Sequence, residues 1–286
     1  MGEWWREIER RFARARLFYG HGTHNAREES AWLVCHVLRI PFDQMSDALG
    51  RKVTGADTRR LDAVAERRIR TREPLAYVLR EAWLQHRRFY VDRRVIVPRS
   101  HIAELLGGGL SAWLPRGGPR RVLDLCTGSG CLAILAAQAF PRARVDASDV
   151  SSAALAVAKR NVAAYRLRSR VRLVRSDLFA ALGGARYELI ICNPPYVRTA
   201  EMRRLPSEYR HEPQLALASG RDGLDFVRRL LAEARLHLAP RGALVVEVGD
   251  GRRALERAFP RLAFTWLAAS GGEDSMFVLG RDELPE

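Results

Sequence analysis

Short apolar runs alternate with longer segments rich in Ala and Leu through the second half of the chain. Runs of this kind predict strands, and the segments between them predict helices. Strands that alternate with helices form a mostly parallel sheet with helices on both faces. The predicted strands span 121–125, 144–148, 170–174, 188–192 and 243–248, and the predicted helices span 131–140, 152–165 and 223–238.

The last segment of the chain departs from this alternation. Residues 264–267 and 276–279 form two apolar runs, and the polar stretch 270–275 lies between them. A parallel crossover needs about a dozen residues or more, so these runs predict a hairpin. We therefore predict an α/β fold with a doubly wound, mostly parallel sheet and one late antiparallel strand.

The first 80 residues follow a helical period instead. Trp4, Ile8 and Phe12 recur at helical spacing, and apolar residues repeat in the same way within 31–38 and 61–69. This region of the chain is therefore predicted to be a small helical domain.

Two features separate the helical region from the alternating region. Within 86–99, β-forming residues flank a charged segment at 92–94, which predicts a short hairpin. Gly and Pro residues then frame 110–114, which we predict to be a flexible entry to the second domain. The predicted division is a helical domain at 1–84, a hairpin and linker at 85–119, and an α/β domain at 120–286.

The chain is strongly basic, with 48 basic and 33 acidic side chains and a formal net charge of +15. A charge of this size favours an anionic neighbourhood such as RNA or a ribonucleoprotein. An arginine-rich genome explains the charge equally well, and both interpretations stay open. The arginines within 59–72 likewise form either the solvated face of a helix or a nucleic-acid contact.

No segment predicts a membrane anchor, a disulfide framework or a metal site. No apolar run approaches the ~20 residues that span a bilayer, and charged residues interrupt the apolar positions near the N-terminus. The four cysteines contain no CxxC pair, and the seven histidines form no HExxH motif. The sequence therefore predicts a cytoplasmic protein without membrane contact and without a metal.

A glycine-rich turn follows the first predicted strand of the α/β region. Asp124 and Leu125 end this strand, and Gly128 and Gly130 lie in the turn that enters the next helix. Glycines permit a tight turn and allow a ligand to approach backbone N–H groups. Such loops at a helix N-terminus often hold pyrophosphate, and Gly128, Gly130 and Ala133 match a loose dinucleotide fingerprint. The loop alone does not distinguish a dehydrogenase from another nucleoside-binding protein.

Acidic residues end or follow the next two predicted strands. Asp149 is placed to accept both hydroxyl groups of a ribose, or to cap the following helix, and the two roles are compatible. Asp177 could accept from an adenine amine while Leu178 covers the base, but an ordinary turn residue is an equal interpretation of Asp177 alone. Together with the glycine loop, these acids predict a nucleoside pocket.

The segment Asn193-Pro-Pro-Tyr196 is the most specific motif in the chain, and it directly follows the fourth predicted strand. The Asn193 side-chain oxygen and the Pro194 carbonyl are both able to accept from one planar NH2 group. The two prolines fix the backbone, Pro195 included, and remove competing donors. Tyr196 supplies an aromatic wall.

These residues resemble the class I S-adenosylmethionine-dependent methyltransferases, in particular the amino-methylating branch with Asn-Pro-Pro-Tyr. The helical region and hairpin make nearly the whole chain similar to the protein-glutamine N5-methyltransferases. Release-factor enzymes of this family typically have Pro-Arg-Pro before an acidic residue, whereas this chain reads Pro98-Arg-Ser-His-Ile102. Four segments are more similar to the members that modify the third large-subunit ribosomal protein. They are the segment just quoted, 81–83, 125–131 and 211–213.

The resemblance implies a role for each motif. S-adenosylmethionine would be the methyl donor, with Asp149 on its ribose and Asp177 and Leu178 flanking its adenine. Asn193, Pro194 and Tyr196 would be catalytic, and with Pro195 they would hold the substrate glutamine. Cys126 replaces a glycine common in the wider superfamily, so it is expected to affect cofactor affinity. The cofactor-binding set is Asp124, Cys126, Thr127, Gly128, Ser129, Gly130, Asp149, Asp177, Leu178 and Asn193.

The implied substrate is the third large-subunit ribosomal protein, with ribosomal RNA possible nearby. The helical domain at 1–84 would dock this substrate. Methylation of release factors is the nearest alternative, followed by adenine-N6 methylation of nucleic acid, although the helical domain leaves little room for a base-recognition module. An assembly factor with a vestigial pocket is the non-enzymatic alternative.

Glu247 lies within an apolar strand, where a carboxylate is rarely free. It either anchors the substrate loop or is simply a satisfied buried acid. No residue at the Asn193 motif has the properties of a strong general base. The amide proton is therefore expected to leave to water after methyl transfer.

Overall fold

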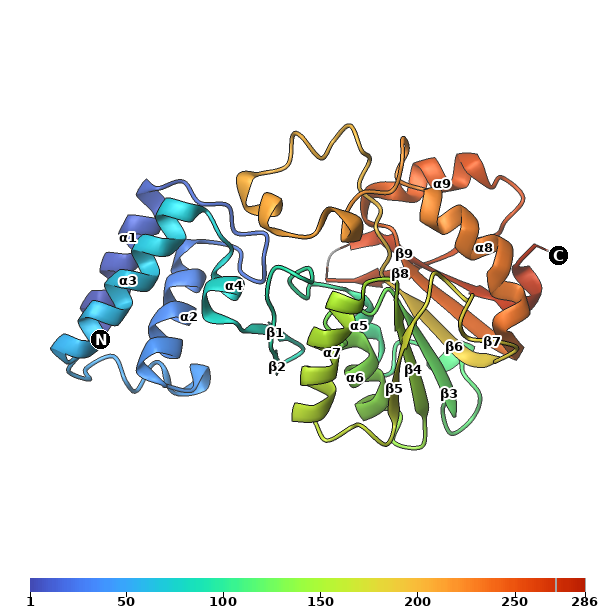
Figure 1. Ribbon diagram of the computed structural model, residues 1–286, viewed down its shortest axis with the longest axis horizontal. Helices are drawn as coiled ribbons and strands as arrows, with labels where there is room; N and C mark the ends of the chain where they lie inside the picture. Colours follow the sequence, from blue (N-terminus) through green and yellow to red (C-terminus); the bar gives the residue numbers. More distant parts are fainter. Residues whose placement is uncertain (271, 286) are drawn as a thin grey trace.

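The computed structural model describes residues 1–270 and 272–285. A helical N-terminal domain lies beside an α/β domain, and a small hairpin connects them along the chain (Figure 1). The loop 197–223, gold in Figure 1, extends from the sheet back toward the helical domain. We call this segment the 197–223 loop.

Seven strands form the main sheet in the order β5-β4-β3-β6-β7-β9-β8. The strands from β3 to β7 are mutually parallel, and β9 is antiparallel to both of its neighbours. The predicted late antiparallel strand is therefore confirmed. The strands are β3 (Arg121–Leu125), β4 (Arg144–Asp149), β5 (Val171–Arg175), β6 (Tyr187–Cys192), β7 (Leu238–Glu247), β8 (Thr265–Ala269) and β9 (Gly272–Gly280).

Side chains of alternate residues in the central strands lie on opposite faces of the sheet. Val122 of β3 packs against one helical layer, whereas Leu123 packs against the other. Because both faces are buried, the strands read as continuous apolar runs in the sequence. The helices α5 (Ile102–Leu105), α6 (Cys131–Ala139) and α7 (Ser152–Ala164) cover one face, and α8 (Asp225–His237) and α9 (Arg252–Ala258) cover the other.

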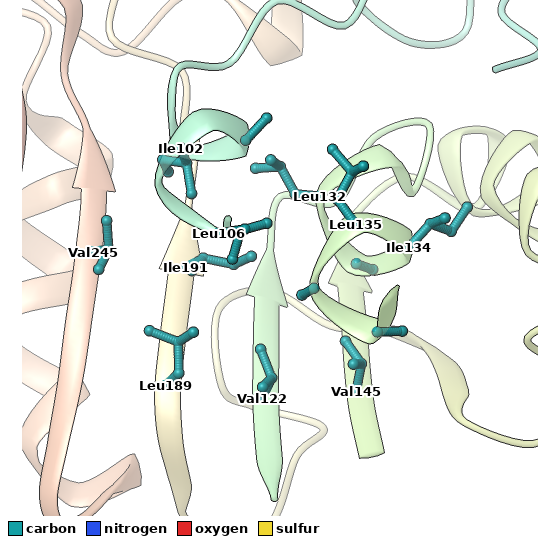
Figure 2. Close-up of a cluster of buried hydrophobic side chains, with 14 of the residues drawn as sticks. Ile102, Leu106, Val122, Leu132, Ile134, Leu135, Val145, Leu189, Ile191 and Val245 are labelled. Carbon is teal, nitrogen blue, oxygen red and sulfur yellow. The ribbon is translucent and has the colours of Figure 1, made fainter. Parts of the chain in front are cut away.

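The predicted flexible entry at 110–114 is instead packed against the sheet. Figure 2 shows Ile102 and Leu106 above the strand residues Val122 and Ile191. Leu110 is also almost fully buried in this cluster. Gly and Pro signalled a break in secondary structure here, but the leucines between them are held by apolar burial. A short helix, η2 (Ser111–Trp113), follows.

The N-terminal domain is helical, as predicted. Its core includes the fully buried Ile8, Phe12 and Leu61. Asn25 and Thr54 cap their helices by accepting from backbone N–H groups three residues later. The helices are α1 (Gly2–Arg14), α2 (Ala26–Leu38), η1 (Phe42–Gln44), α3 (Gly55–Thr71) and α4 (Leu75–Leu79).

The predicted hairpin around 92–94 is wrong. The strands that pair are β1 (Ala82–Leu84) and β2 (Arg87–Phe89), and both residues of their turn, Gln85 and His86, have positive φ. Such turns usually contain Asn or Gly, so the sequence lacked the usual signal. Val91, Val95 and Val97 are buried in the helical core instead, so their spacing reflects packing rather than strand pairing.

The remaining boundaries shift by a few residues. β7 begins at Leu238 rather than at 243, and β9 begins at Gly272 rather than at 276. Short helical turns complete the chain: η3 (Ser207–His211), η4 (Gln214–Ala216), η5 (Gly249–Gly251) and η6 (Arg281–Glu283). Across the described residues of the chain, no helix has the length and apolar character needed to span a bilayer.

Candidate active site

The site lies where the order of the parallel strands reverses. β3 has β4 on one side and β6 on the other, and Leu125 lies opposite Cys192. In open α/β sheets, ligands bind outside the carboxyl ends of the strands at this switch point. The glycine loop leaves β3 there and the Asn193 motif leaves β6 there, so the fold brings the two motifs together.

Asp124 is completely buried at the end of β3. Its Oδ2 accepts from Thr127 Oγ1 at 2.5 Å and from the Ala133 N–H at 2.9 Å. Its Oδ1 is buried and has no partner among the residues that the structure describes. Burial raises the pKa of Asp124 to about 7. This orphaned acceptor is suited to a cationic donor, such as an ammonium group.

The glycine loop has a strained backbone that neighbouring elements fix in place. Cys126, Gly128 and Gly130 all have positive φ. Thr127 donates its N–H to the Ser148 carbonyl of β4. A Cβ on Gly130 would lie 3.1 Å from the Ala158 Cβ on α7, so a glycine is required both by φ and by this close approach.

Asn161 of α7 hydrogen-bonds the backbone of the glycine loop, a role that the sequence analysis missed. Its amide nitrogen donates to the Ser129 carbonyl at 2.8 Å and to the Tyr90 carbonyl at 3.0 Å. Its oxygen accepts from the Tyr90 N–H at 2.8 Å. Asn161 thus connects the loop to the segment that follows the hairpin. An Asn inside a helix has no sequence signature for this contact.

Asp149 lies at the end of β4, where the sequence places it. Its Oδ2 accepts from the Gly128 N–H and its Oδ1 from the Ser151 N–H, both at 2.9 Å. The cap of α7 is Ser151, which accepts from the Ala154 N–H. The suggestion that Asp149 itself caps the helix is therefore wrong. Burial raises the pKa of this carboxyl group.

Asp177 and Leu178 lie beyond the end of β5. Asp177 is exposed, and its Oδ2 accepts from Arg229 Nη2 at 2.9 Å. The Leu178 side chain is buried in the cluster beneath the sheet, and its φ is positive. The roles of these two residues beside adenine stay predictions.

The Asn193 motif borders a cavity of about 330 Å³. Asn193, Pro194 and Tyr196 line it on one side, and Arg99 and Tyr209 also line it. Within the described ranges, no group hydrogen-bonds the Asn193 carboxamide or the Pro194 carbonyl. Among the described residues these two adjacent acceptors therefore have no partner, and their role in holding a substrate amide stays a prediction.

Two glycines fix Tyr196. A Cβ on Gly249 would lie 2.8 Å from Cε2 of the Tyr196 ring, and a Cβ on Gly223 would lie 2.4 Å from the Tyr196 carbonyl oxygen. Both glycines have positive φ. The sequence analysis did not identify either position. Isolated glycines of this kind carry no motif, and only the fold shows what they approach.

We predict that Gly223→Ala lowers kcat by about 10²-fold, because the new methyl group displaces the backbone that follows Asn193. Cofactor affinity should stay within about twofold, since the glycine loop lies on a different strand end. Steady-state kinetics and calorimetric titration of the cofactor measure the two quantities. Gly184→Ala, in open space on another loop, is the matched control. An unchanged kcat in Gly223→Ala would contradict this geometry.

Buried ion pairs attach the 197–223 loop to the helical domain. Glu208 has no exposed surface, and it accepts from the Phe18 N–H at 3.0 Å. Arg72 Nε donates to the neighbouring Ser207 Oγ and forms an ion pair with Glu208 at 3.0 Å. Arg68 Nη1 lies 3.5 Å from Glu208, and Arg68 Nε donates to Glu29 at 2.7 Å. The cavity wall is therefore built from the loop and indirectly from the first domain.

The arginines within 59–72 are not simply a solvated face. Arg67 pairs with Glu73, Arg68 pairs with Glu29 and Glu208, and Arg72 pairs with Glu208. The exposed Arg60 lies 4.0 Å from Asp57, and Arg59 and Arg70 are exposed as well. Four of the six arginines thus form intramolecular ion pairs, which the sequence pattern did not distinguish from a nucleic-acid contact.

Glu247 is a satisfied buried acid. Its Oε2 accepts from Ser100 Oγ at 2.6 Å and from the His101 N–H at 3.0 Å. It therefore anchors the segment before α5 and not the 197–223 loop. All four cysteines are free thiols. In the portion of the chain with described coordinates, no group of three His, Cys, Asp or Glu side chains is placed to hold a metal ion.

Family models match both domains of the chain. The methyltransferase small domain matches residues 110–207, and the PrmC N-terminal domain matches residues 3–79. Among solved structures, the catalytic domain of hMettl16 in complex with MAT2A 3'UTR hairpin 6 has a TM-score of 0.52 and 15% identity, over 79% of this chain and 81% of that chain. This likeness shows a shared fold.

Curated relatives match over nearly the whole length. The ribosomal protein uL3 glutamine methyltransferase of Bordetella pertussis is 52% identical over 273 residues, 94% of this chain and 91% of that protein. The protein of the same name from Neisseria meningitidis serogroup B is 50% identical, over 96% of this chain and 90% of the relative. The names of these relatives do not favour the release-factor or the nucleic-acid alternative.

Proposed function

This chain belongs to the ribosomal protein uL3 glutamine methyltransferases, and we propose that Asn193 and Pro194 hold the target glutamine of uL3 for methylation of its side-chain nitrogen by S-adenosylmethionine. The observation that carries this assignment is the pair of available acceptors at the cavity wall, on the strand end next to the one from which the glycine loop leaves. The cofactor motif and the amide motif converge at the switch point of the sheet.

The residues around Asp124 fit the proposed cofactor. The buried Oδ1 of Asp124 has no partner in the described structure and is able to accept from the ammonium group of the methionine moiety. The loop from Cys126 to Gly130 would surround that moiety, and Asp149 would accept from the ribose. Asp177 and Leu178 would flank the adenine. When bound, the sulfonium supplies an activated methyl group with a good leaving group.

The protein then mainly has to position the nucleophile. An amide nitrogen is weakly nucleophilic because its lone pair is delocalised into the carbonyl group. The Asn193 Oδ1 and the Pro194 carbonyl would accept both N–H groups of the substrate, which fixes the amide plane. Tyr196 would close one side of the site. Alignment of this kind can lower a barrier by ~7–11 kcal/mol.

Neither Tyr196, which lines the cavity, nor Glu212, which pairs with Arg99, is suited to act as a general base. Burial raises the pKa of Tyr196, so its phenol stays protonated at neutral pH. Burial also acts to raise the pKa of Glu212, but Arg99 and His21 together outweigh this effect and lower the pKa to about 2. A carboxylate paired in this way is a weak base. The amide proton therefore leaves to water after methyl transfer.

The proposed substrate, a ribosomal protein, implies a role for the helical domain, a neighbouring RNA and a location in the cell. The helical domain would dock uL3, and the net charge of +15 is compatible with nearby ribosomal RNA. An enzyme that modifies a ribosomal protein is expected to act in the cytoplasm.

The cofactor affinity should depend on pH through Asp124. Its pKa is raised to about 7, so the neutral acid predominates below that pH and the carboxylate predominates above it. Because an ammonium group binds the carboxylate better, the cofactor Kd should fall by about tenfold between pH 6 and pH 8. Asp124→Asn should bind the cofactor more weakly and lose this dependence. Calorimetric titration at several pH values tests both points, and an unchanged pH profile in Asp124→Asn would exclude this role.

The substrate assignment is tested by transfer of a tritium-labelled methyl group. Purified uL3, release factors and oligonucleotides are offered separately, and mass spectrometry locates the modified residue. We expect labelling of a glutamine in uL3 alone. Labelling of release factors alone would overturn the substrate, and cofactor binding without any labelling would favour the assembly factor.

A further inference from the structure

We propose that Arg99 is a second contact for the target peptide and that its guanidinium group donates to a carbonyl oxygen of that peptide. This inference rests on the proposed function, because it requires a peptide in the cavity beside Asn193. Arg99 lines the same cavity as Asn193 and Tyr196, and its side chain is 23% exposed.

The backbone that carries Arg99 is fixed on both sides. Before it, the Val97 N–H donates to Glu212 Oε1 at 2.9 Å. After it, Ser100 and His101 donate to Glu247. Both carboxylates are buried. Glu247 is therefore a positioning residue for the segment that presents Arg99, which explains an acid at the end of an apolar strand.

The guanidinium group is also held in one orientation. Its Nη1 and Nη2 donate to the two oxygens of Glu212 at 2.6 and 2.8 Å, and Nη1 also donates to the Val97 carbonyl at 3.1 Å. Its carbon lies 5.4 Å from the centre of the Tyr209 ring. A side chain fixed in this way loses little entropy when it binds a ligand.

Two donors of this group are left over. A guanidinium has five N–H groups, and the interactions of Arg99 use both on Nη1 and one on Nη2. The Nε–H and the second Nη2–H share one edge of the planar group. Neither has a partner among the described residues. Arg99, which is partly exposed on the cavity wall, therefore has two adjacent N–H groups that are available to a ligand.

The charge of the site favours a neutral acceptor. Glu212 stays ionised because Arg99 and His21 lower its pKa to about 2 despite its burial. Arg99 and Glu212 together carry no net charge, so a phosphate or carboxylate would gain little attraction from them. A peptide carbonyl needs only the donor edge. This site accordingly suits a polypeptide better than a nucleic acid.

The test compares variants in steady-state methylation of uL3. Arg99→Ala should raise the KM for uL3 by about 10- to 100-fold, while the Kd for the cofactor changes by less than about twofold. Because that variant leaves Glu212 buried and unpaired, Arg99→Met/Glu212→Gln is measured beside it, with thermal unfolding followed by circular dichroism. Arg142→Ala, an exposed arginine in the turn before β4, is the matched control and should keep the wild-type KM.

Added methylguanidinium should lower the raised KM of Arg99→Ala, because it supplies the missing donors. A purely structural role would not respond to it. A folded double variant with wild-type KM would overturn the proposal for Arg99 but would leave the function of Asn193 intact. Failure of the wild-type protein to label uL3 would instead refute the proposed function itself.

Discussion

Asn193→Ala should lower kcat by about 10²- to 10³-fold, which a labelling assay registers as loss of turnover. The substitution removes one of the two acceptors at the cavity wall and leaves the Pro194 carbonyl alone. A glutamine amide with one N–H unbound is free to rotate out of the plane that methyl transfer requires. The adjacent strand end, with Asp124 and the glycine loop, keeps its contacts.

The cofactor Kd of Asn193→Ala should therefore stay within about tenfold of the wild-type value. Asn193→Gln provides a stricter test, because it keeps the amide but moves it by one methylene, and it should also lose turnover. Asn25→Ala removes an exposed helix cap far from the site and should retain turnover. Wild-type kcat in Asn193→Ala would refute the assignment of the motif.

Arg68→Met should lower the free energy of unfolding by about 3–5 kcal/mol, because removal of one partner of a buried ion pair leaves an uncompensated charge. The side chain of Arg68 is only 1% exposed, and it lies between the carboxylates of Glu29 and Glu208. It also donates to the Phe18 carbonyl at 2.9 Å. Urea unfolding monitored by fluorescence measures the loss.

Arg70→Met, an exposed arginine on the same helix, is the control and should change the free energy of unfolding by less than about 0.5 kcal/mol. The triple variant Arg68→Met/Glu29→Gln/Glu208→Gln should recover most of the stability, since it removes the buried charges together. Equal stabilities of Arg68→Met and the wild type would show that the buried ion pairs of Arg68 do not attach the 197–223 loop to the helical domain.

This network has a functional consequence, because Glu208 belongs to the 197–223 loop. Tyr209, the next residue, lines the cavity and lies against both His21 and Arg99. The helical domain thus holds the loop that lines the cavity. Arg68→Met should accordingly affect the KM for uL3 as well as stability, whereas it should leave cofactor affinity unchanged.

The sequence predicted best where burial imposes a simple period. The α/β alternation located the central strands because both of their faces are buried, and it predicted the antiparallel strand because 270–275 is too short for a crossover. Asp124, Asp149 and Asn193 were placed correctly at strand ends because parallel strands all end at one edge of the sheet. Local sequence carries these properties.

Prediction from the sequence was wrong or undecided where the same residue pattern is compatible with two different structures. Val91, Val95 and Val97 have the spacing of paired strands, but they pack into the helical core. The arginines within 59–72 form one charged run in the sequence, but four of the six form internal ion pairs. The valines, Arg68 and Arg72 meet partners that lie far away along the chain, so no local pattern identifies them.

Residue patterns were enough to predict the layered α/β architecture, the helical first domain and the motifs expected to bind cofactor and amide, since each depends on residues close together in the chain. The surroundings of the Asn193 motif became apparent only from the packing of the folded chain. Arg99 comes from the segment before α5, whereas Glu212 and Gly223 come from the 197–223 loop. Their roles depend on a buried charge or a missing side chain meeting its counterpart across the fold, and such contacts exist only after the chain has packed.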